Sequence, residues 1–259
     1  MEIMLHEIAE KLRHSRRVLF ITGAGVSADS GLPTYRGVGG LYNSGETEEG
    51  LAIEEALSGE CFAVRPDITW KYLAQIQHNC HAVQPNAAHQ AIADLEQVLE
   101  VVVLTQNIDG LHLKAGSTDV IEIHGTLDEC CCSQCGRDAF PVIQLALDVL
   151  PRCTECDGVV RPKVVLFGES LPEPAMRRLY EALDEDFGMV FLIGTTAVFP
   201  YIAEPVVMAV RAGVPTVEIN PARTRMSDHV DYYIPLGAAE AMAAIHKALL
   251  RESGINEDY

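Results

Sequence analysis

Six short apolar runs alternate with polar or amphipathic segments along the chain. Uninterrupted apolar runs of this length, bounded by glycine or polar clusters, are typical of strands buried within a parallel sheet. Strands that are separated by helical segments favour an α/β protein. The strands predicted in this way span Val18–Thr22, Val101–Thr105, Val120–His124, Met189–Gly194, Thr216–Asn220 and Asp231–Pro235.

Helical patterns fill most of the remaining chain. Ile3–His14 gathers its apolar residues on one face, Asn86 is suited to cap the helix that follows it, and Ala238–Leu250 forms a closing helix of alanines and leucines. Residues 50–81 have a helical pattern without a strand, which indicates a helical insertion. We therefore expect a doubly wound, parallel, Rossmann-like sheet that carries insertions.

The alternation of strands and helices stops between residues 126 and 169 and then resumes, which indicates a small inserted domain. The Rossmann-like domain would comprise 1–45, 82–125 and 170–251, with the helical insertion at 46–81, the small domain at 126–169 and a frayed tail at 252–259.

Composition and charge narrow the classes of function. Of 259 residues, 48% are hydrophobic, which is enough to bury a sizeable core, and no apolar run approaches the roughly 18 residues of a membrane span. The N-terminal stretch lacks the order of a signal peptide. A formal net charge of −18 argues against direct binding to nucleic acid and is compatible with a basic, lysine-rich partner. We expect a soluble, cytoplasmic monomer that binds neither membranes nor nucleic acid.

The first predicted strand ends in the turn Gly23-Ala24-Gly25, which resembles a phosphate-binding turn. Such a turn brings backbone N–H groups and a helix N-terminus close to a pyrophosphate. An ordinary glycine-rich strand-to-helix turn is the simpler alternative. A dehydrogenase would need a second strand with an acidic end about 20 residues later, but a polar loop, Ser30–Gly45, stands there instead. The loop is expected to lie over whatever ligand the turn binds.

Polar side chains follow four of the predicted strands, and in an open parallel sheet the carboxyl ends of the strands share one crevice. His124 has the position of a general base that works near neutral pH. The simpler interpretations are a structural hydrogen bond for a histidine at a strand end and loop capping for Asn107 and Asp109. The remaining candidates at these strand ends are Gln106, Asn107, Asp109, Gly194, Thr195 and Asn220.

Two Cys-x-x-Cys pairs, Cys132/Cys135 and Cys153/Cys156, are separated by 17 residues (136–152). This spacing predicts a tetrahedral zinc site, and four thiolates would leave no open coordination position, so the zinc would be structural. A redox-active dithiol is the alternative. The neighbouring Cys130 also remains a possible ligand, although the spacing favours Cys132.

In this order, these motifs resemble the sirtuin family over about residues 15–250. The stretches that carry the resemblance are GAGVSADSGLPTYRG, TQNIDGLH, IHG, the two cysteine pairs, VVLFGE, GTTAVFP and EIN. The glycines after Arg36 are most similar to the bacterial desuccinylase-like branch. The resemblance implies an NAD-dependent protein deacylase with one structural zinc ion. NAD would be a consumed co-substrate, and the acyl group of an acylated lysine would be transferred to ADP-ribose.

The resemblance also implies roles for individual residues. His124 would be the base, with Asn107 and Asp109 orienting the ribose and nicotinamide. NAD would be bound by Gly23, Ala24, Gly25, Tyr35, Arg36, Gln106, Gly194, Thr195 and Asn220. The backbone of Val165, Leu166, Phe167, Gly168 and Glu169 would pair with the substrate as an added strand.

The sequence departs from the desuccinylase-like branch at its acyl-binding pair. Aligned on Trp70, Leu73 and Ile76 stand where that branch carries tyrosine and arginine. Burying a succinyl carboxylate without a cation is costly, so we expect an apolar pocket for acetyl or longer neutral chains. An NAD-dependent mono-ADP-ribosyltransferase and a non-catalytic NAD-sensing module are the alternative functions.

Overall fold

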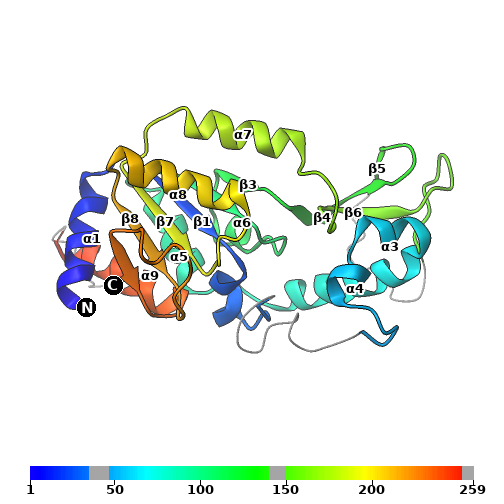
Figure 1. Cartoon of the computed structure of the whole chain (residues 1–259), viewed down its shortest axis with the longest axis horizontal. Coiled ribbons are helices and arrows are strands. Elements are labelled where there is room, and N and C mark those ends of the chain that lie inside the picture. Colours follow the sequence, from blue (N-terminus) through cyan, green and yellow to red (C-terminus); the bar gives the residue numbers. More distant parts are fainter. Residues whose placement is uncertain (35–46, 140–149, 253–259) are drawn as a thin grey trace.

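The computed structural model describes residues 1–34, 47–139 and 150–252. Within them, six parallel strands form the main sheet in the order β3-β2-β1-β7-β8-β9 (Figure 1). The strand order reverses direction between β1 and β7, and ligands bind at such switch points in doubly wound sheets. The strands are β1 (Arg17–Thr22), β2 (Glu100–Thr105), β3 (Val120–Glu122), β7 (Met189–Ile193), β8 (Thr216–Ile219) and β9 (Tyr232–Ile234).

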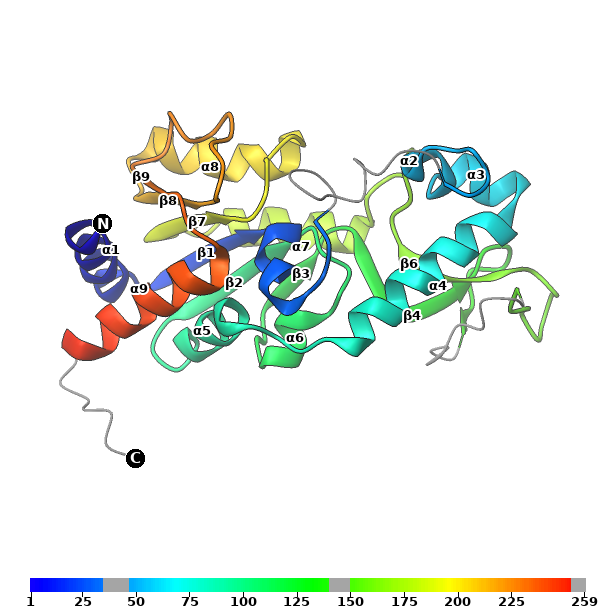
Figure 2. The same cartoon turned by 90° about the horizontal axis from the view of Figure 1, so that it is seen from below.

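Helices cover both faces of this sheet, because alternate strand residues point to opposite sides. Phe20 packs with residues of α1, α5 and α9 on one face, whereas Leu19 packs with residues of α7 and α8 on the other (Figure 2). Both layers exclude water from an apolar central strand. The helices are α1 (Glu2–His14), α5 (Ala87–Leu95), α7 (Glu173–Leu183), α8 (Pro200–Ala212) and α9 (Ala238–Glu252).

A second group of elements lies at the end of the molecule away from α1 and α9 (Figure 1). It combines three helices with a small antiparallel sheet of order β5-β4-β6. Phe62, Leu73, Leu127 and Val164 belong to one buried cluster that joins the helices to this sheet. The elements are α2 (Ile53–Ala56), α3 (Gly59–Val64), α4 (Pro66–Ala82), β4 (Gly125–Cys132), β5 (Asp138–Ala139) and β6 (Val160–Val164).

The predicted fold class is confirmed: a parallel Rossmann-like sheet, its helices and a separate cysteine-bearing module are present. The glycine turn leads into a helix as expected, here the 3-10 helix η1 (Ala24–Ser30). One local detail differs from the sequence expectation: β3 ends at Glu122, so His124 belongs to the following loop. A short helix, α6 (Leu111–Ala115), follows β2 and was not predicted.

Some predictions fall on residues outside the described ranges. These are Tyr35 and Arg36, most of the loop Ser30–Gly45, and the tail after residue 252. Among the helices of the described residues, none is both long and apolar enough to cross a bilayer.

Candidate active site

Gln106, directly after β2, connects three neighbouring strand ends through hydrogen bonds. Its side-chain nitrogen donates to the Thr22 carbonyl oxygen at 3.3 Å and to Thr195 Oγ1 at 2.8 Å. Its own carbonyl oxygen accepts a hydrogen bond from His124 Nδ1 at 2.9 Å. The polar residues predicted at these strand ends therefore meet at one edge of the sheet.

The glycine turn after β1 packs directly against the end of β7. Gly25 N–H donates to the Gly194 carbonyl oxygen at 2.9 Å, and a Cβ on Gly25 would lie only 2.6 Å from Gly194 Cα. Gly194 itself has a positive φ of 60°. No larger side chain fits where these two backbones touch, so both positions require glycine. This packing places the η1 N-terminus at the switch point, where a phosphate group would be stabilised.

His124 has a defined tautomer. A carbonyl oxygen only accepts hydrogen bonds, so Nδ1 carries the hydrogen that is donated to Gln106, and Nε2 retains a lone pair. Nε2 lies 2.7 Å from the hydroxyl of Tyr201. Burial lowers the pKa of His124, and the Gln106 carbonyl only partly opposes this shift. The imidazole is therefore neutral and basic at Nε2 near pH 7, as a general base requires.

Asn107 and Asp109 share a hydrogen-bond partner in Ser27. The Ser27 hydroxyl donates to Asp109 Oδ2 at 2.7 Å, and Asn107 Nδ2 lies 3.1 Å from the same hydroxyl oxygen. Asp109 Oδ1 accepts from the backbone N–H of Leu111 at 3.0 Å. Burial raises the pKa of Asp109, and these hydrogen bonds to its oxygens counteract the rise. The amide and the carboxylate are thus held in fixed orientations beside the glycine turn.

Thr195 and Asn220 extend the site along the ends of β7 and β8. Asn220 Nδ2 donates to the Thr195 carbonyl oxygen at 3.1 Å. Thr195 Oγ1 accepts from the Ala197 N–H at 3.2 Å, in addition to its bond with Gln106. This arm of the crevice lies on the far side of the switch point from Asn107 and Asp109. A two-part ligand such as a dinucleotide could therefore span the glycine turn.

An apolar cavity opens between the glycine turn and α4. Ile76, one of the two predicted acyl-binding residues, lines it, whereas Leu73 is 2% exposed and packs in the cluster with Phe62 and Leu127. The described residues around the cavity include no lysine or arginine. They are Ala24, Ser27, Leu32, Pro33, Ile76, Asn79, Cys80, Asn107, Ile108 and Asp109.

The predicted substrate-binding segment, residues 165–169, follows β6. Val165 N–H donates to the His124 carbonyl oxygen at 2.8 Å, and Phe167 N–H donates to the Leu57 carbonyl oxygen at 3.0 Å. Glu169 accepts from Arg161 at 2.6 Å and from the Leu166 N–H at 2.9 Å. One edge of the segment is therefore hydrogen-bonded to His124 and Leu57 of the same chain. The Glu169 side chain stabilises the turn that contains Gly168.

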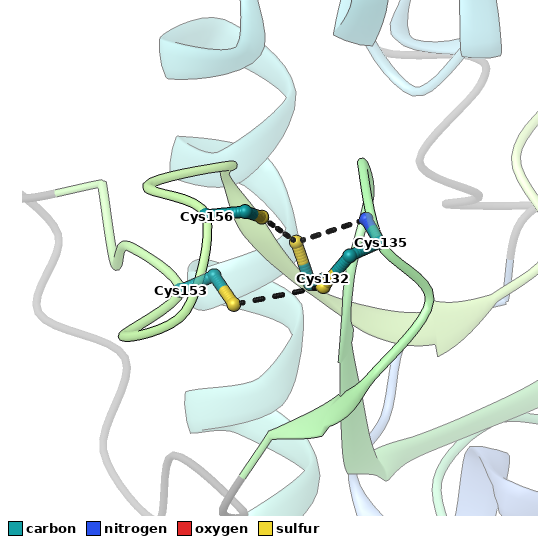
Figure 3. A group of neighbouring side chains, drawn as sticks. All are labelled: Cys132, Cys135, Cys153 and Cys156. Atoms are coloured by element: carbon teal, nitrogen blue, oxygen red, sulfur yellow. Dashed lines mark hydrogen bonds between the residues drawn. The ribbon is translucent and has the colours of Figure 1, made fainter.

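The four cysteines of the two pairs form one cluster (Figure 3). Their sulfur atoms lie within 4.8 Å of one another, and the Cys132–Cys156 and Cys135–Cys153 pairs are 3.5 and 3.8 Å apart. Tetrahedral zinc with Zn–S bonds of about 2.3 Å needs sulfur atoms about 3.8 Å apart. The cluster therefore fits a structural zinc ion. Cys130 is not part of it, so the choice of Cys132 on spacing is supported.

Three residues that lie at or directly beneath the predicted site were not assigned from the sequence. Ser27 lies inside the glycine-rich motif and could have been found as a hydroxyl next to the turn. His112 Nε2 lies 3.0 Å from Thr22 Oγ1 beneath the site. Tyr201, in the first turn of α8, contacts His124, and nothing in the sequence pattern distinguishes it from a surface tyrosine.

Fold and site together define a nucleotide-binding α/β protein that has a histidine at its crevice and a separate four-thiolate zinc module. A sequence profile described as the Sir2 family matches residues 23–200, and the chain belongs to that family.

The chain is similar to proteins and structures of this family over nearly its whole length. It is 49% identical to NAD-dependent protein deacylase 2 of Pseudomonas aeruginosa, covering 94% of this chain and 96% of the relative. It is 38% identical to NAD-dependent protein deacylase 1 of Archaeoglobus fulgidus, covering 93% and 94%. A solved Sir2 homologue in complex with NAD has a TM-score of 0.85 at 34% identity, covering 95% of this chain and 94% of that one.

A second solved structure shows a family member with a peptide. It is a Sir2 protein with a deacetylated p53 peptide and 3'-O-acetyl ADP ribose, similar at a TM-score of 0.83 and 29% identity, covering 96% of this chain and 98% of that one.

Proposed function

We propose that this chain is an NAD-dependent protein-lysine deacylase that removes acetyl or longer neutral acyl groups and consumes NAD. The products would be nicotinamide, O-acyl-ADP-ribose and free lysine. The observation that carries the proposal is the neutral His124, whose basic Nε2 lies at the crevice formed by the glycine turn, Asn107 and Asp109. The proposal also includes action as a monomer in the cytoplasm on acylated lysines of protein segments.

Each group of the site has a role in this proposal. Gly23, Ala24 and Gly25 hold the pyrophosphate, and Thr195 and Asn220 hold the adenosine half. Asn107 and Asp109 orient the ribose and nicotinamide. NAD supplies the electrophilic sugar carbon that receives the acyl oxygen. His124 Nε2 takes a proton from a ribose hydroxyl, and the imidazolium that forms is supported by the bond from Nδ1–H to Gln106.

Tyr35, Arg36 and the segment 165–169 complete the proposed site. We place Tyr35 and Arg36 with the NAD-binding residues, as the motif suggests. The segment Val165–Glu169 would pair through its outer edge with the substrate backbone, because its inner edge is bonded to Leu57 and His124.

The cavity supports the choice of neutral acyl groups. Ile76 stands where an arginine would bind an acidic acyl tail, and Asp109 would repel a second carboxylate. Tyr72 is adjacent to the aligned position, but its hydroxyl donates to Glu49 Oε2 at 2.6 Å. That tyrosine is therefore engaged elsewhere in the structure. An acidic acyl chain would find no cationic partner among the described residues of the cavity.

A variant of the proposed base tests this function. His124→Ala should lose at least about 100-fold in deacylation of an acetyl-lysine peptide, since general base catalysis typically contributes 10²–10⁴-fold. NAD binding, measured by calorimetry, should stay within a few-fold of wild type. His14→Ala, at an exposed position on α1, serves as the matched control. Full activity of His124→Ala, or nicotinamide release that does not require the acylated peptide, would contradict the proposal.

A further inference from the structure

The hydroxyl of Tyr201 contacts the nitrogen that the proposed reaction uses. Tyr201 lies in the first turn of α8, and its oxygen is 2.7 Å from His124 Nε2. Because Nδ1 donates to Gln106, Nε2 carries the single lone pair of the ring. The phenol must therefore donate its hydrogen to this lone pair while the imidazole is neutral.

The phenol keeps its proton under these conditions. Burial raises the pKa of Tyr201 to about 12, so the side chain is neutral near pH 7. A neutral phenol both donates and accepts hydrogen bonds. It can consequently serve as a donor to neutral imidazole and as an acceptor from imidazolium, with only a rotation of its hydrogen.

The aromatic surroundings hold this hydroxyl in place. The Tyr201 ring stacks on Phe199 with centroids 5.4 Å apart and an interplanar angle of 12°. His124 meets both rings edge to face, at centroid distances of 6.0 Å to Phe199 and 5.9 Å to Tyr201. Pro200, between the two aromatic residues, begins α8 with a fixed φ. The rigid start of α8 therefore fixes the position of the Tyr201 side chain relative to His124.

We propose that Tyr201 is a positioning residue for His124, which it holds in one orientation by bonding to Nε2 before and after proton transfer. The proposal rests on the deacylase function described above. As a substrate hydroxyl approaches, the phenol hydrogen turns away, because one lone pair accepts only one strong hydrogen bond. The substrate O–H bond breaks, an Nε2–H bond forms, and the phenol oxygen accepts from the new imidazolium. Tyr201 neither gains nor loses a proton.

Tyr201 makes one hydrogen bond with neutral His124 and another with its imidazolium, and the strengths of these two bonds decide how Tyr201 changes the pKa of His124. A hydrogen bond from imidazolium to the phenol oxygen is charge-assisted and is roughly twice as strong as the neutral bond that it replaces. Tyr201 therefore favours the protonated form and partly offsets the lowering of the His124 pKa by burial. Burial is the largest cause of the lowered His124 pKa, and no charged side chain of the described residues contributes to the shift.

A masking role would have the opposite consequence. If Tyr201 only competed with the substrate for the lone pair of Nε2, removing its hydroxyl would free the base and raise kcat. If it positions the base, the same change would leave the imidazolium without an acceptor at Nε2, and kcat would fall.

The experiment compares Tyr201→Phe with Tyr180→Phe, whose tyrosine is 56% exposed on α7. Full-length protein labelled with ¹⁵N-histidine is titrated by NMR without ligand, and the His124 signals are assigned by their loss in His124→Ala. We expect Tyr201→Phe to lower the His124 pKa by about 0.5 to 1 unit and to shift the Nε2 resonance, since charge-assisted bonds exceed neutral ones by that order. Tyr180→Phe should change neither.

Kinetics on an acetyl-lysine peptide complete the test. Tyr201→Phe should lower kcat about tenfold with both KM values within about twofold, and the acid limb of the kcat profile should move to lower pH. An unchanged His124 titration or an increased kcat would overturn the proposal. The titration does not require enzymatic activity, so the two proposals can fail separately. If only the deacylase function fails, the wild-type protein will not deacylate the peptide, but Tyr201→Phe will still lower the His124 pKa.

Discussion

Two histidines are buried directly behind the proposed site. His89 and His112 are 0% and 2% exposed, and their ring centroids are 4.8 Å apart. Burial lowers the pKa of His89 to about 4; burial and then the neighbouring His89 lower that of His112 to about 3. Both rings are neutral in the folded protein at pH 7. They contribute packing and hydrogen bonds without adding positive charge beside the NAD site.

These lowered pKa values make stability depend on pH in a defined direction. An unfolded chain binds protons at histidine below about pH 6.5, whereas folded His112 remains neutral down to about pH 3. The stabilisation is complete above pH 6.5 and is lost as the pH falls toward 3. Glu122, whose pKa burial raises to about 7, acts in the opposite direction, because its stabilisation is lost as the pH rises from about 4.5 to 7.

We predict that His112→Gln flattens the acid side of the stability profile. Between pH 6 and pH 5, the free energy of unfolding of wild type should fall more steeply than that of the variant, by about 1.4 kcal/mol per pH unit for one proton. Urea unfolding at several pH values measures both slopes. His89 and Glu122 are present in both proteins, so the difference isolates His112. Parallel slopes would show that His112 is not buried in the neutral form.

Where position along a strand decides it, the place of a residue at the crevice could be predicted from the sequence. His124, Gln106 and Asn107 were placed at the crevice because they directly follow predicted strands, and the structure brings them together. Tyr201 could not be found in this way, because its contact with His124 depends on how α8 packs on the sheet. The burial of Leu73 behind Ile76 likewise depends on the rotation of α4 about its axis.

Among the elements, we expect the small antiparallel sheet and its cysteine loops to depend most on a metal. Cys132 ends β4, and the other three cysteines lie in the loops that follow β4 and precede β6. The module has little apolar core of its own apart from its contacts with α3 and α4. Zinc would join the two loops by four bonds. In this arrangement, metal binding contributes directly to folding of the module.

Removal of zinc should therefore loosen the module and abolish activity. We expect one zinc ion per chain by elemental analysis, and its loss in Cys153→Ser together with a clear drop in Tm. Cys61→Ser changes a cysteine outside the cluster and should retain the metal. Retention of a full equivalent of zinc by Cys153→Ser would contradict the assignment of ligands.

Element boundaries followed from sequence pattern wherever apolar runs were long. β1, β2 and β7 match their predicted runs within a residue, and Asn86 caps α5 by accepting from the Ala88 N–H. β4 and β6 were not predicted, because a strand interrupted by cysteines and a proline lacks a clear apolar period. The domain division itself stays a proposal.

At the scale of the whole molecule, the cavity lies where the helical insertion meets the sheet. Its wall combines Ile76 of α4 with Ile108 and Asp109 after β2. In the proposed function, residues far apart in sequence would therefore decide which acyl group is accepted. The net charge of −18 would also attract lysine-rich protein segments over a distance. We therefore expect the cavity to set the preference for one acyl group over another, and the overall charge to speed the encounter with a basic protein substrate.

We predict the order of acyl preference from this cavity. Acetyl- and octanoyl-lysine peptides should be turned over at least about tenfold more efficiently than a succinyl-lysine peptide, since an unpaired buried carboxylate costs more than about 1.4 kcal/mol. Ile76→Arg should reduce the difference in turnover between the neutral acyl peptides and the succinyl-lysine peptide, because it supplies a cation for the succinyl carboxylate. Efficient desuccinylation by the wild-type chain would show that another residue neutralises the acyl carboxylate.

The most direct test of the account follows both products of a single reaction. Purified protein is incubated with NAD and an acetyl-lysine peptide, and the peptide is then examined by mass spectrometry while nicotinamide is quantified. We predict loss of one acetyl mass from the peptide, one nicotinamide for each acetyl removed, and one O-acetyl-ADP-ribose. A peptide that gains the mass of ADP-ribose would identify a transferase, and no NAD-dependent change would leave only NAD sensing; either result would contradict deacylation.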